Sequence, residues 1–316
     1  MAMKSYKGFD KKLKCRDFQY EIGKEYEMDG EIKVCSRGFH ACESPFDVFD
    51  HYAMIDSRFC EVEQDGNISK EDRGPKICSS KIKIKAELKL ADMINLGVEW
   101  LKEITSPEKI KTSIKDNSSG NDAQIGSSGY DAKSGSSDNG AQIGSSGYGA
   151  QIGSSGYGAQ IGSSGYGAKI GSSGNGAKIG SSGYGAKIGS SGNDAKIGSS
   201  GNDAQIGSSG NGAQIGSSGN GAQIGSSGDD AKIGSSGNGA QIDSTGEDCV
   251  IMCAGINSVA KASKGSWITL SEWSYSDKKQ RYIPVCVKTE FVDGKKIKAD
   301  TYYSLKGGVF VESVNN

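Results

Sequence analysis

The middle of the chain repeats a nine-residue pattern of apolar and polar positions. Numbered from its alanine, the unit reads Ala(1)-Lys/Gln(2)-Ile(3)-Gly(4)-Ser(5)-Ser(6)-Gly(7)-Asn/Tyr(8)-Gly/Asp(9), and this register runs from Ile114 to about Ser266. Position 3 is aliphatic in almost every unit, with Ser134 as the interior exception. A flexible Gly/Ser linker has no reason to keep an aliphatic residue in phase, so the pattern predicts a folded repeat.

The spacing within the unit predicts a β-solenoid whose coils contain two units each. Positions 1 and 3 share one face of a strand, which buries Ala and Ile and leaves Lys or Gln at position 2 on the other face. Nine extended residues would close into a loop only about 10 Å across, which is too narrow to hold an Ile side chain. Two units instead form a coil flattened into two parallel sheets, with positions 4–9 as the turns.

The tyrosines of the repeat support this coil. Four of them are spaced by 18 residues, and Tyr157 falls in the other phase. An 18-residue coil stacks the four in one column along one edge. This column and the regular lysines are the candidate binding residues of the repeat, which are Tyr130, Tyr148, Tyr166, Tyr184, Lys169, Lys178, Lys187 and Lys196.

The segment before the repeat has the patterns of an α+β domain. Residues 81–90 alternate strictly, which predicts a half-buried strand with Ile82, Ile84, Ala86 and Leu88 on its apolar face. Residues 91–104 have apolar side chains at helical spacing, and Ser44 followed by Pro45 is typical of a helix start. Further strands are predicted over residues 19–28, 31–40 and 58–66.

The last part of the chain predicts a small β-meander that caps the solenoid. Asp293-Gly294 and Gly307-Gly308 separate apolar runs, as hairpin turns do. In the last repeat units Val250 takes the outward position 2, and Cys249, Met252 and Cys253 make that unit apolar nearly all round. We expect the meander to cover this unit, with Trp267, Trp273, Tyr302 and Tyr303 contributing.

The predicted fold class is therefore mainly β. An α+β domain spans residues 1–106, the nonapeptide solenoid residues 107–266, and the meander cap residues 267–316.

Composition and charge narrow the class of protein. The 316 residues include 48 glycines and only 4 prolines, which excludes a collagen or a proline-rich linker. Lysine and arginine total 37 against 38 aspartates and glutamates, so no excess charge favours nucleic acid or an anionic membrane as partner. The chain has no apolar run long enough for a membrane span, and its first residues have no apolar signal region. With eight cysteines read as reduced thiols, these features predict a cytoplasmic protein.

The repeat offers little support for bound ions or cofactors. Calcium-binding nonapeptide rolls need a fixed aspartate followed two residues later by an apolar residue, and this repeat has neither. Cys35, His40 and Cys42 lie close in sequence, and Cys15, His51 and Cys60 could join them. Their spacing matches no zinc motif, so we expect core thiols and assign no metal and no cofactor. Ser(5) and Ser(6) together would form a regular hydroxyl array, which is the basis of an ice- or surface-binding alternative.

The order of motifs in the N-terminal segment resembles that of ADP-ribosyltransferase cores. The motifs are "YKGF", "GFHACESPFDVFDHYA" and the Glu-x-Glu of "EVE". The resemblance implies a transferase or nucleotide-binding site that would contain Lys7, His40, Glu61 and Glu63. The sequence departs from that family because a lysine takes the usual arginine position and no Ser-Thr-Ser motif follows. We therefore favour a binding protein over an enzyme. If the domain is an enzyme, its catalytic candidates are His40, Glu61 and Glu63.

A second resemblance covers both ends of the chain. "YKGFDKKLKCRDFQYEIGKEYE", "GFHACESPFDV" and "DGKKIKADTYYSLKGGVFVE" resemble uncharacterised phage and bacterial proteins in which such an N-terminal "GFHACE" domain precedes short tandem repeats. The resemblance implies a bacterial cell or a phage-infected host, and it carries no activity.

The resulting hypothesis is a non-enzymatic structural or interaction protein. Its solenoid would present a repetitive surface to a protein partner or to copies of itself. The alternatives are the transferase-like or nucleotide-binding N-terminal domain on a solenoid scaffold, and the ice- or surface-binding solenoid.

Overall fold

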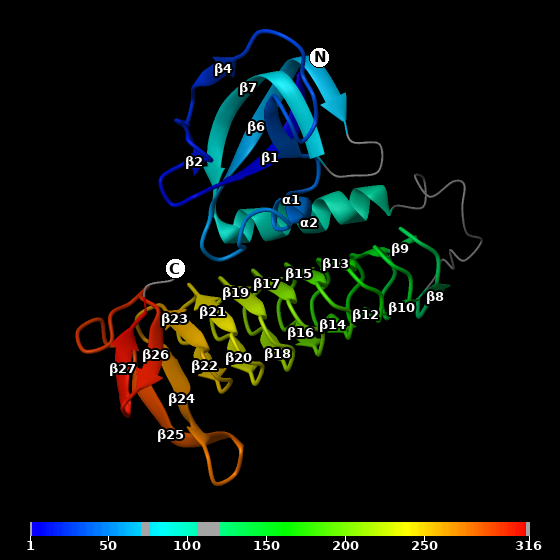
Figure 1. The fold of residues 1–316 in the computed structure, drawn as a ribbon. Coiled ribbons are helices and arrows are strands. Elements are labelled where there is room, and N and C mark those ends of the chain that lie inside the picture. Colours follow the sequence, from blue (N-terminus) through cyan, green and yellow to red (C-terminus); the bar gives the residue numbers. More distant parts are fainter. Residues whose placement is uncertain (1, 71–75, 106–120, 314–316) are drawn as a thin grey trace. The chain divides into compact units, whose positions relative to one another are not determined.

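The computed structural model describes residues 2–70, 76–105 and 121–313. The chain divides into two compact units, Met1–Trp100 and Leu101–Asn316. The first is a small sheet domain and the second contains the solenoid with its C-terminal strands (Figure 1). Ile114, where the repeat register begins, lies outside the described residues.

The first unit is built on one five-stranded antiparallel sheet. Its strands follow the order β4-β7-β5-β1-β6. They are β1 (Met3–Phe9), β4 (Glu25–Glu27), β5 (Phe39–Cys42), β6 (Arg58–Lys70) and β7 (Lys76–Leu88). A separate two-stranded ribbon consists of β2 (Lys14–Cys15) and β3 (Phe18–Gln19).

Four of these strands close into a ring. Strand β7 pairs with both β5 and β6, and both of those strands pair with β1. Phe9, Val62, Ile82 and Ile84 fill the interior. Inside the domain Ser5 donates to Gln64 Oε1 (2.8 Å), and Gln64 Nε2 donates to the carbonyl oxygen of Phe39 (2.8 Å). These bonds satisfy a buried amide that would otherwise be costly.

The sequence predicted where both helices of the first unit lie, but it did not predict how short the first of them is. Helix α2 (Leu90–Ile104) follows β7 as predicted, with Met93, Ile94 and Val98 buried. Helix α1 (Pro45–Val48) has only four residues, and its N-cap Ser44 makes no capping hydrogen bond through its side chain. In the predicted strand 81–90 the expected apolar face ends early, because Ile82 and Ile84 are buried whereas Ala86 is exposed.

The second unit is a β-solenoid of about eight coils, as the repeat predicts. Every coil contributes one short strand to each of two parallel sheets (Figure 1). Solenoid sheet 1 contains β8 (Gln124–Ser127), β10 (Gln142–Ser145), β12 (Gln160–Ser163), β14 (Lys178–Ser181), β16 (Lys196–Ser199), β18 (Gln214–Ser217), β20 (Lys232–Ser235) and β22 (Val250–Cys253). Solenoid sheet 2 contains β9 (Lys133–Ser136), β11 (Gln151–Ser154), β13 (Lys169–Ser172), β15 (Lys187–Ser190), β17 (Gln205–Ser208), β19 (Gln223–Ser226), β21 (Gln241–Ser244) and β23 (Val259–Ala262).

The strands stack in the predicted 18-residue register. In sheet 1, for example, Ile143 lies opposite Ile161, and in sheet 2 Ile152 lies opposite Ile170. Ala(1) and Ile(3) of both sheets point inward and form one continuous apolar core. The inward Ile columns therefore hold the coils together, as expected for a stacked repeat in which each coil contacts its neighbours.

Two turn positions restrict the residue for different physical reasons. Position 9 has a positive φ in every described unit, for example 68° at Gly221 and 54° at Asp203. Only Gly, Asp and Asn occur there, because these residues reach left-handed backbone most easily. At position 7 a Cβ atom would overlap the carbonyl oxygen of the position 7 glycine one coil before, as at Gly219 above Gly201.

Position 8 forms a ladder along each edge of the solenoid. On one edge the rings of Tyr148, Tyr166 and Tyr184 stack with centroids 5.1 Å apart, and Tyr130 continues the column. Beyond the tyrosines on this edge, and also on the other edge, asparagine Oδ1 atoms accept the backbone N–H of position 8 one coil later. Examples are the bonds from Asn220 to Asn202 (2.9 Å) and from Asn211 to Asn193 (3.0 Å). The predicted single tyrosine column is confirmed, since Tyr157 lies on the other edge.

Four C-terminal strands extend the two solenoid sheets. Strand β24 (Trp267–Ser276) continues sheet 1 and forms a hairpin with β25 (Arg281–Phe291). Strand β26 (Tyr303–Lys306) pairs with β23 in sheet 2 and forms a hairpin with β27 (Val309–Glu312). Tyr303 and Leu305 are buried against the last coils.

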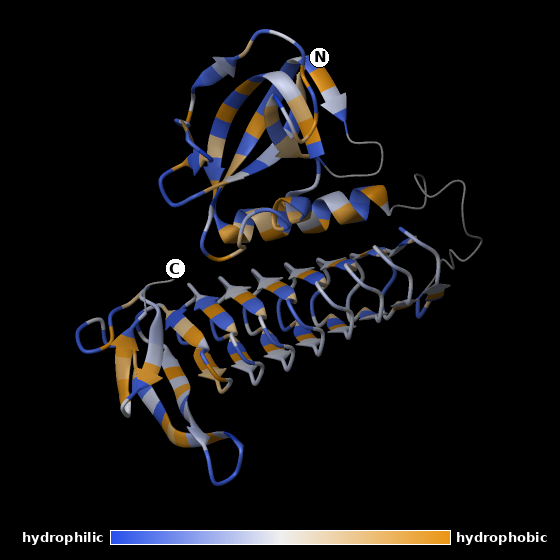
Figure 2. Cartoon of the chain, in the orientation of Figure 1, coloured by the Kyte–Doolittle hydropathy of each residue, from blue (hydrophilic) through white to orange (hydrophobic). Residues whose placement is uncertain are grey.

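The expectation that this cap covers the whole apolar unit is wrong in part. Cys249, Ile251 and Cys253 are buried, but Val250 and Met252 are 50% and 54% exposed on the outer face of sheet 1. Trp267 belongs to the same exposed face because β24 continues sheet 1, which places this side chain outward next to Val250. Figure 2 shows the change as a shift towards hydrophobic colours over the last strands.

Candidate functional site

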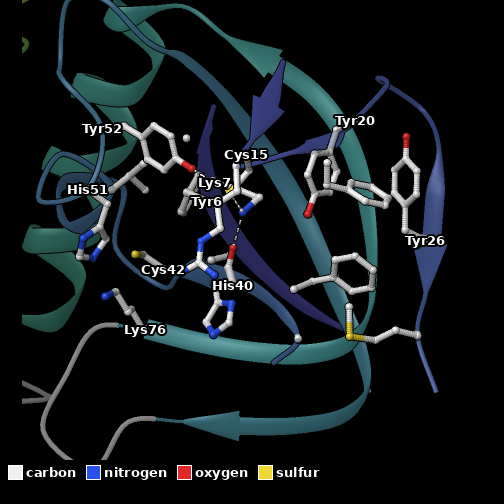
Figure 3. Close-up of a pocket in the computed structure, with 18 of the residues that line it drawn as sticks. Tyr6, Lys7, Cys15, Tyr20, Tyr26, His40, Cys42, His51, Tyr52 and Lys76 are labelled. Atoms are coloured by element: carbon white, nitrogen blue, oxygen red, sulfur yellow. Dashed lines mark hydrogen bonds between the residues drawn. The ribbon is translucent and has the colours of Figure 1, made fainter. Parts of the chain in front are cut away.

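The first unit contains a pocket of about 850 Å³. Residues of β1, the β2–β3 ribbon, β4, β5, the segment around α1 and the start of β7 line it. Figure 3 shows Tyr20 and Tyr26 on one side and His51 and Lys76 on the other, with Lys7 and His40 between them. Its size is that of a small-molecule site.

Lys7 of β1 lies in the interior of this pocket. Its side chain is 4% exposed, and Nζ donates to the carbonyl oxygen of His40 (2.9 Å). The Sγ atom of Cys15 lies 3.5 Å from the same nitrogen. The rings of Phe9 and Tyr20 have centroids 5.4 and 5.5 Å from it. Burial lowers the pKa of Lys7 below its ordinary value because the protein interior disfavours the charged amine.

His40 of β5 is half-buried beside Lys7. Its Nε2 accepts a hydrogen bond from the backbone N–H of Cys35 (2.9 Å). Burial lowers the pKa of His40, and the charges of Lys7, Arg16 and Lys76 lower it further. His40 is therefore held as a neutral imidazole near three cations.

Tyr52 and Cys15 complete the polar part of the pocket. The Tyr52 hydroxyl donates to Cys15 Sγ (2.9 Å), and burial raises the pKa of Tyr52. Gly8 allows this arrangement, because a Cβ atom at Gly8 would overlap the ring of Tyr52. The "KG" of "YKGF" thus supplies both the buried amine and the space for the tyrosine.

An aromatic wall forms the other side of the pocket. Phe18, Tyr20, Tyr26 and Phe39 pack edge to face or tilted, with ring centroids 4.7 to 6.5 Å apart. Phe18 remains 46% exposed. A large ring this open to water favours contact with a ligand more than a purely structural role.

The three catalytic candidates from the transferase resemblance do not come together. His40 lines the pocket, but Glu61 and Glu63 of β6 do not. Glu61 pairs with Lys4 (2.7 Å) and Glu63 with Lys85 (3.0 Å) on the partly exposed face of the sheet. Both glutamates therefore have ordinary ion-pair partners, and the structure places neither beside Lys7 or His40.

The cysteines and histidines considered for a metal show a mixed placement. Cys15, Cys35, Cys42 and His51 line the pocket with His40, whereas Cys60 is buried in the domain core. Burial raises the pKa of Cys42 to about 12 and that of Cys60 to about 12, which keeps these thiols protonated. Within residues 2–70, 76–105 and 121–313, no group of three or more His, Cys, Asp or Glu side chains is placed to hold a metal ion.

The four candidate lysines of the repeat lie on two different sheets. Lys178 and Lys196 are on sheet 1, and Lys169 and Lys187 are on sheet 2. On the outer face of sheet 1, positions 2 and 4 of the repeat strands are both solvent-facing. A shallow groove follows these positions along the coils.

The floor of this groove is a column of glycines that we call the open glycine column. It consists of Gly126, Gly144, Gly162, Gly180, Gly198, Gly216 and Gly234. A Cβ atom at any of them would meet nothing within 4 Å. Packing within the chain therefore does not require glycine there. At its end the groove meets an exposed apolar patch formed by Val250, Met252, Trp267 and Phe291, in which the last two rings lie 5.0 Å apart.

The serine array of the ice-binding alternative is only partly on the surface. Ser(5) points into the core, so that Ser145, Ser154 and Ser217 are buried. Only Ser(6) is left on the outside, which removes half of the expected hydroxyl array.

Sequence reasoning missed several residues of the pocket. It did not single out Arg16, Phe18, Tyr52 or Lys76, because nothing in their spacing indicates that they share a site. The one sequence signal was the "YKGF" motif of β1, which places Lys7 among Tyr6, Gly8 and Phe9.

Comparison with known proteins gives one match. Residues 3–96 match a family model described as "Domain of unknown function (DUF7666)". No curated protein and no solved structure matches the chain in these comparisons. The match covers the unit that contains the pocket and ends before the repeat.

A search of the described helices finds none with both the length and the apolar character needed to cross a bilayer.

Proposed function

We propose that the protein is a non-enzymatic interaction scaffold whose solenoid binds an acidic protein partner along the outer face of sheet 1. The observation that carries the proposal is the groove of this face, with its open glycine column, its outward lysines and the apolar patch at its end.

The charge of the face supports an acidic partner. Lys178, Lys196 and Lys232 occupy outward position 2 and make no ion pair with a described residue. The outward positions 2 and 4 of the sheet 1 repeat strands, which are β8, β10, β12, β14, β16, β18, β20 and β22, contain no aspartate or glutamate. The chain as a whole is nearly neutral, so this face is locally basic, and a carboxylate-rich segment complements it.

The shape and the apolar end support an extended protein segment. Glycine within a strand costs stability relative to alanine, so repeated glycines at unhindered positions need a reason other than packing. Because position 4 has no side chain, another chain can lie close to the backbone of the sheet there. The patch around Trp267 provides the apolar contact that gives such interfaces most of their affinity.

Zero-length carbodiimide cross-linking tests the proposal, because it joins lysine amines directly to carboxylates. The full-length protein is treated in host lysate, and peptides joined to Lys178, Lys196 and Lys232 are identified by mass spectrometry. We expect Asp- and Glu-rich peptides of one partner. The variant with Lys178→Glu, Lys196→Glu and Lys232→Glu should not retain that partner.

The matched control carries Lys278→Glu, Lys279→Glu and Lys306→Glu, which make the same charge change at exposed sites among the C-terminal strands. It should retain the partner. The proposal fails if the first variant captures the same proteins as the wild type. It also fails if the lysines join only to carboxylates of this chain or of a second copy of it.

A further inference from the structure

The pocket of the first unit places cations next to an aromatic wall, and we propose that it binds a nucleotide. The phosphate would lie among Lys7, Arg16, Lys76 and His40, and the base against Phe18, Tyr20 and Tyr26. This site is separate from the partner-binding face of the solenoid, so neither proposal depends on the other.

Lys7 lacks an opposite charge among the described residues. Its amine is buried, and its contacts are a carbonyl oxygen, a thiol sulfur and two ring faces. No carboxylate of the described residues forms an ion pair with it. A buried ammonium without a partner is unfavourable, and a bound phosphate would supply the opposite charge.

Further cations converge on the same place. The positive charges of Lys7, Arg16 and Lys76 each lower the pKa of His40, and that of Arg16 also lowers the pKa of Lys7. Neither Arg16 nor Lys76 forms an ion pair with a described residue. Like charges gathered around a concave site repel one another unless an anion occupies it, and arginine and lysine are the usual phosphate ligands.

Backbone conformation points to the same region. Arg16 has a φ of 55° and Cys35 a φ of 64°, and both residues line the pocket. Left-handed backbone is uncommon for such side chains and clusters at ligand sites. At Cys35 it accompanies the N–H bond to His40, and at Arg16 it lies in the tight turn between β2 and β3.

The aromatic wall is suited to a planar ring. Phe18 is half-exposed and in edge-to-face contact with Tyr20 and Tyr26, whose centroids lie 4.7 and 5.3 Å away. Aromatic side chains are the common stacking partners of nucleobases. Asp17 and Glu25 are exposed neighbours of this wall in sequence and line the pocket, where they can accept hydrogen bonds from base N–H groups.

Calorimetric titration of the full-length protein tests the proposal. The probes are AMP, GMP, CMP and UMP, with inorganic phosphate and the four nucleosides as partial ligands. We expect at least one nucleotide to bind with a Kd below about 1 mM, and its nucleoside to bind at least about tenfold more weakly.

Variants of residues outside the buried core separate the two halves of the site. Arg16→Gln with Lys76→Gln should weaken nucleotide binding at least about tenfold, and Phe18→Ala should weaken the nucleotide but not inorganic phosphate. Lys24→Gln is the matched control, since it removes a cation of the same domain that does not line the pocket. Circular dichroism melting verifies that each variant is folded.

The proposal is overturned if none of the four nucleotides binds below about 1 mM. It is equally overturned if Arg16→Gln with Lys76→Gln binds as tightly as Lys24→Gln, or if a nucleoside binds as tightly as its nucleotide. If Phe18→Ala binds the nucleotide as tightly as the wild type does, the base does not bind against the aromatic wall. A nuclear magnetic resonance titration gives an independent readout, because bound phosphate should raise the pKa of His40.

Discussion

Glycine has two different roles within one repeat unit. At position 7, as in Gly219, neighbouring coils approach so closely that a Cβ atom would overlap the backbone of the previous coil. At position 4 of sheet 1, as in Gly216, the same atom would meet open space. The sequence alone cannot separate these cases, because both glycines recur with the same period.

The same substitution at these two glycines should have opposite effects. We expect Gly219→Ala to destabilise the solenoid by about 1–3 kcal/mol through overpacking. Gly216→Ala should stabilise it by about 0.5–1 kcal/mol, because alanine is preferred within a strand and has room. Urea unfolding followed by circular dichroism measures both values. A loss of stability in Gly216→Ala similar to that in Gly219→Ala would contradict this account.

His40 makes the stability of the first unit depend on pH. Its pKa is lowered in the folded state by burial and by Lys7 of β1, Arg16 of the ribbon and Lys76 of β7, while its neutral Nε2 accepts from Cys35. Because the folded pKa lies below the ordinary value of about 6.5, the stabilising contribution is complete above that pH. It is lost as the pH falls through the folded pKa.

We therefore expect the first unit to unfold at a lower denaturant concentration at about pH 5 than at about pH 7.5. His40→Gln should reduce this difference. A ring titration of His40 with a midpoint at or above about 6.5 would refute the prediction.

At the scale of elements, ladders at position 8 stabilise both edges of the solenoid. On one edge Tyr148, Tyr166 and Tyr184 stack ring on ring. Beyond them on that edge, and also on the other edge, asparagines bond to the backbone of the next coil. Both ladders need residues 18 apart, so each edge favours the same coil register as the isoleucine core.

Tyr166→Ala removes ring contacts on both sides, with Tyr148 and with Tyr184. We expect a loss of about 1–3 kcal/mol, since each stacked pair contributes about 0.5–1.5 kcal/mol. Tyr157→Ala is the matched control, because Tyr157 has no ring partner among the described aromatic pairs and its backbone N–H bond to Asn139 remains. Thermal unfolding of the two variants measures how much stability each substitution removes. Equal losses would mean that stacking adds nothing to the coil.

The repeat could be predicted far better than the elements of the first unit. Fourteen isoleucines in phase at position 3 predict the coil, whereas residues 31–40 offered one short stretch. That stretch was predicted as a strand and instead contains only the Lys33–Arg37 bridge before β5. Positive φ at Cys35 and Gly38 interrupts the strand, and side-chain alternation does not record such backbone changes.

At the scale of the whole molecule, the pocket shows why a site is harder to predict than a fold. It joins Lys7, Arg16, His40, Tyr52 and Lys76, which come from five separate parts of the first unit. Closure of the β1-β5-β7-β6 ring brings these residues together, and no local sequence pattern predicts that closure. The motif order pointed to His40 correctly as a pocket residue, but it included Glu61 and Glu63, which face other lysines.

The 18-residue coil also decides which surface features can bind one partner together. Lys178 and Lys196 share sheet 1 with the apolar patch because the number of units between them is even. Deleting residues 205–213 removes one unit and turns the later strands to the opposite sheet. Deleting residues 205–222 removes a whole coil and keeps both features on one face.

We expect both deletions to fold, since each joins position 1 to position 2 and preserves the stacking of coils. Partner binding should survive the 18-residue deletion and fall at least about tenfold in the 9-residue deletion, because Lys178 and Lys196 would then face the opposite direction from the patch and Lys232. Quantitative capture of the cross-linked partner compares the two proteins, with circular dichroism to verify folding. Equal capture by both deletions would show that the partner does not use the lysines and the patch together.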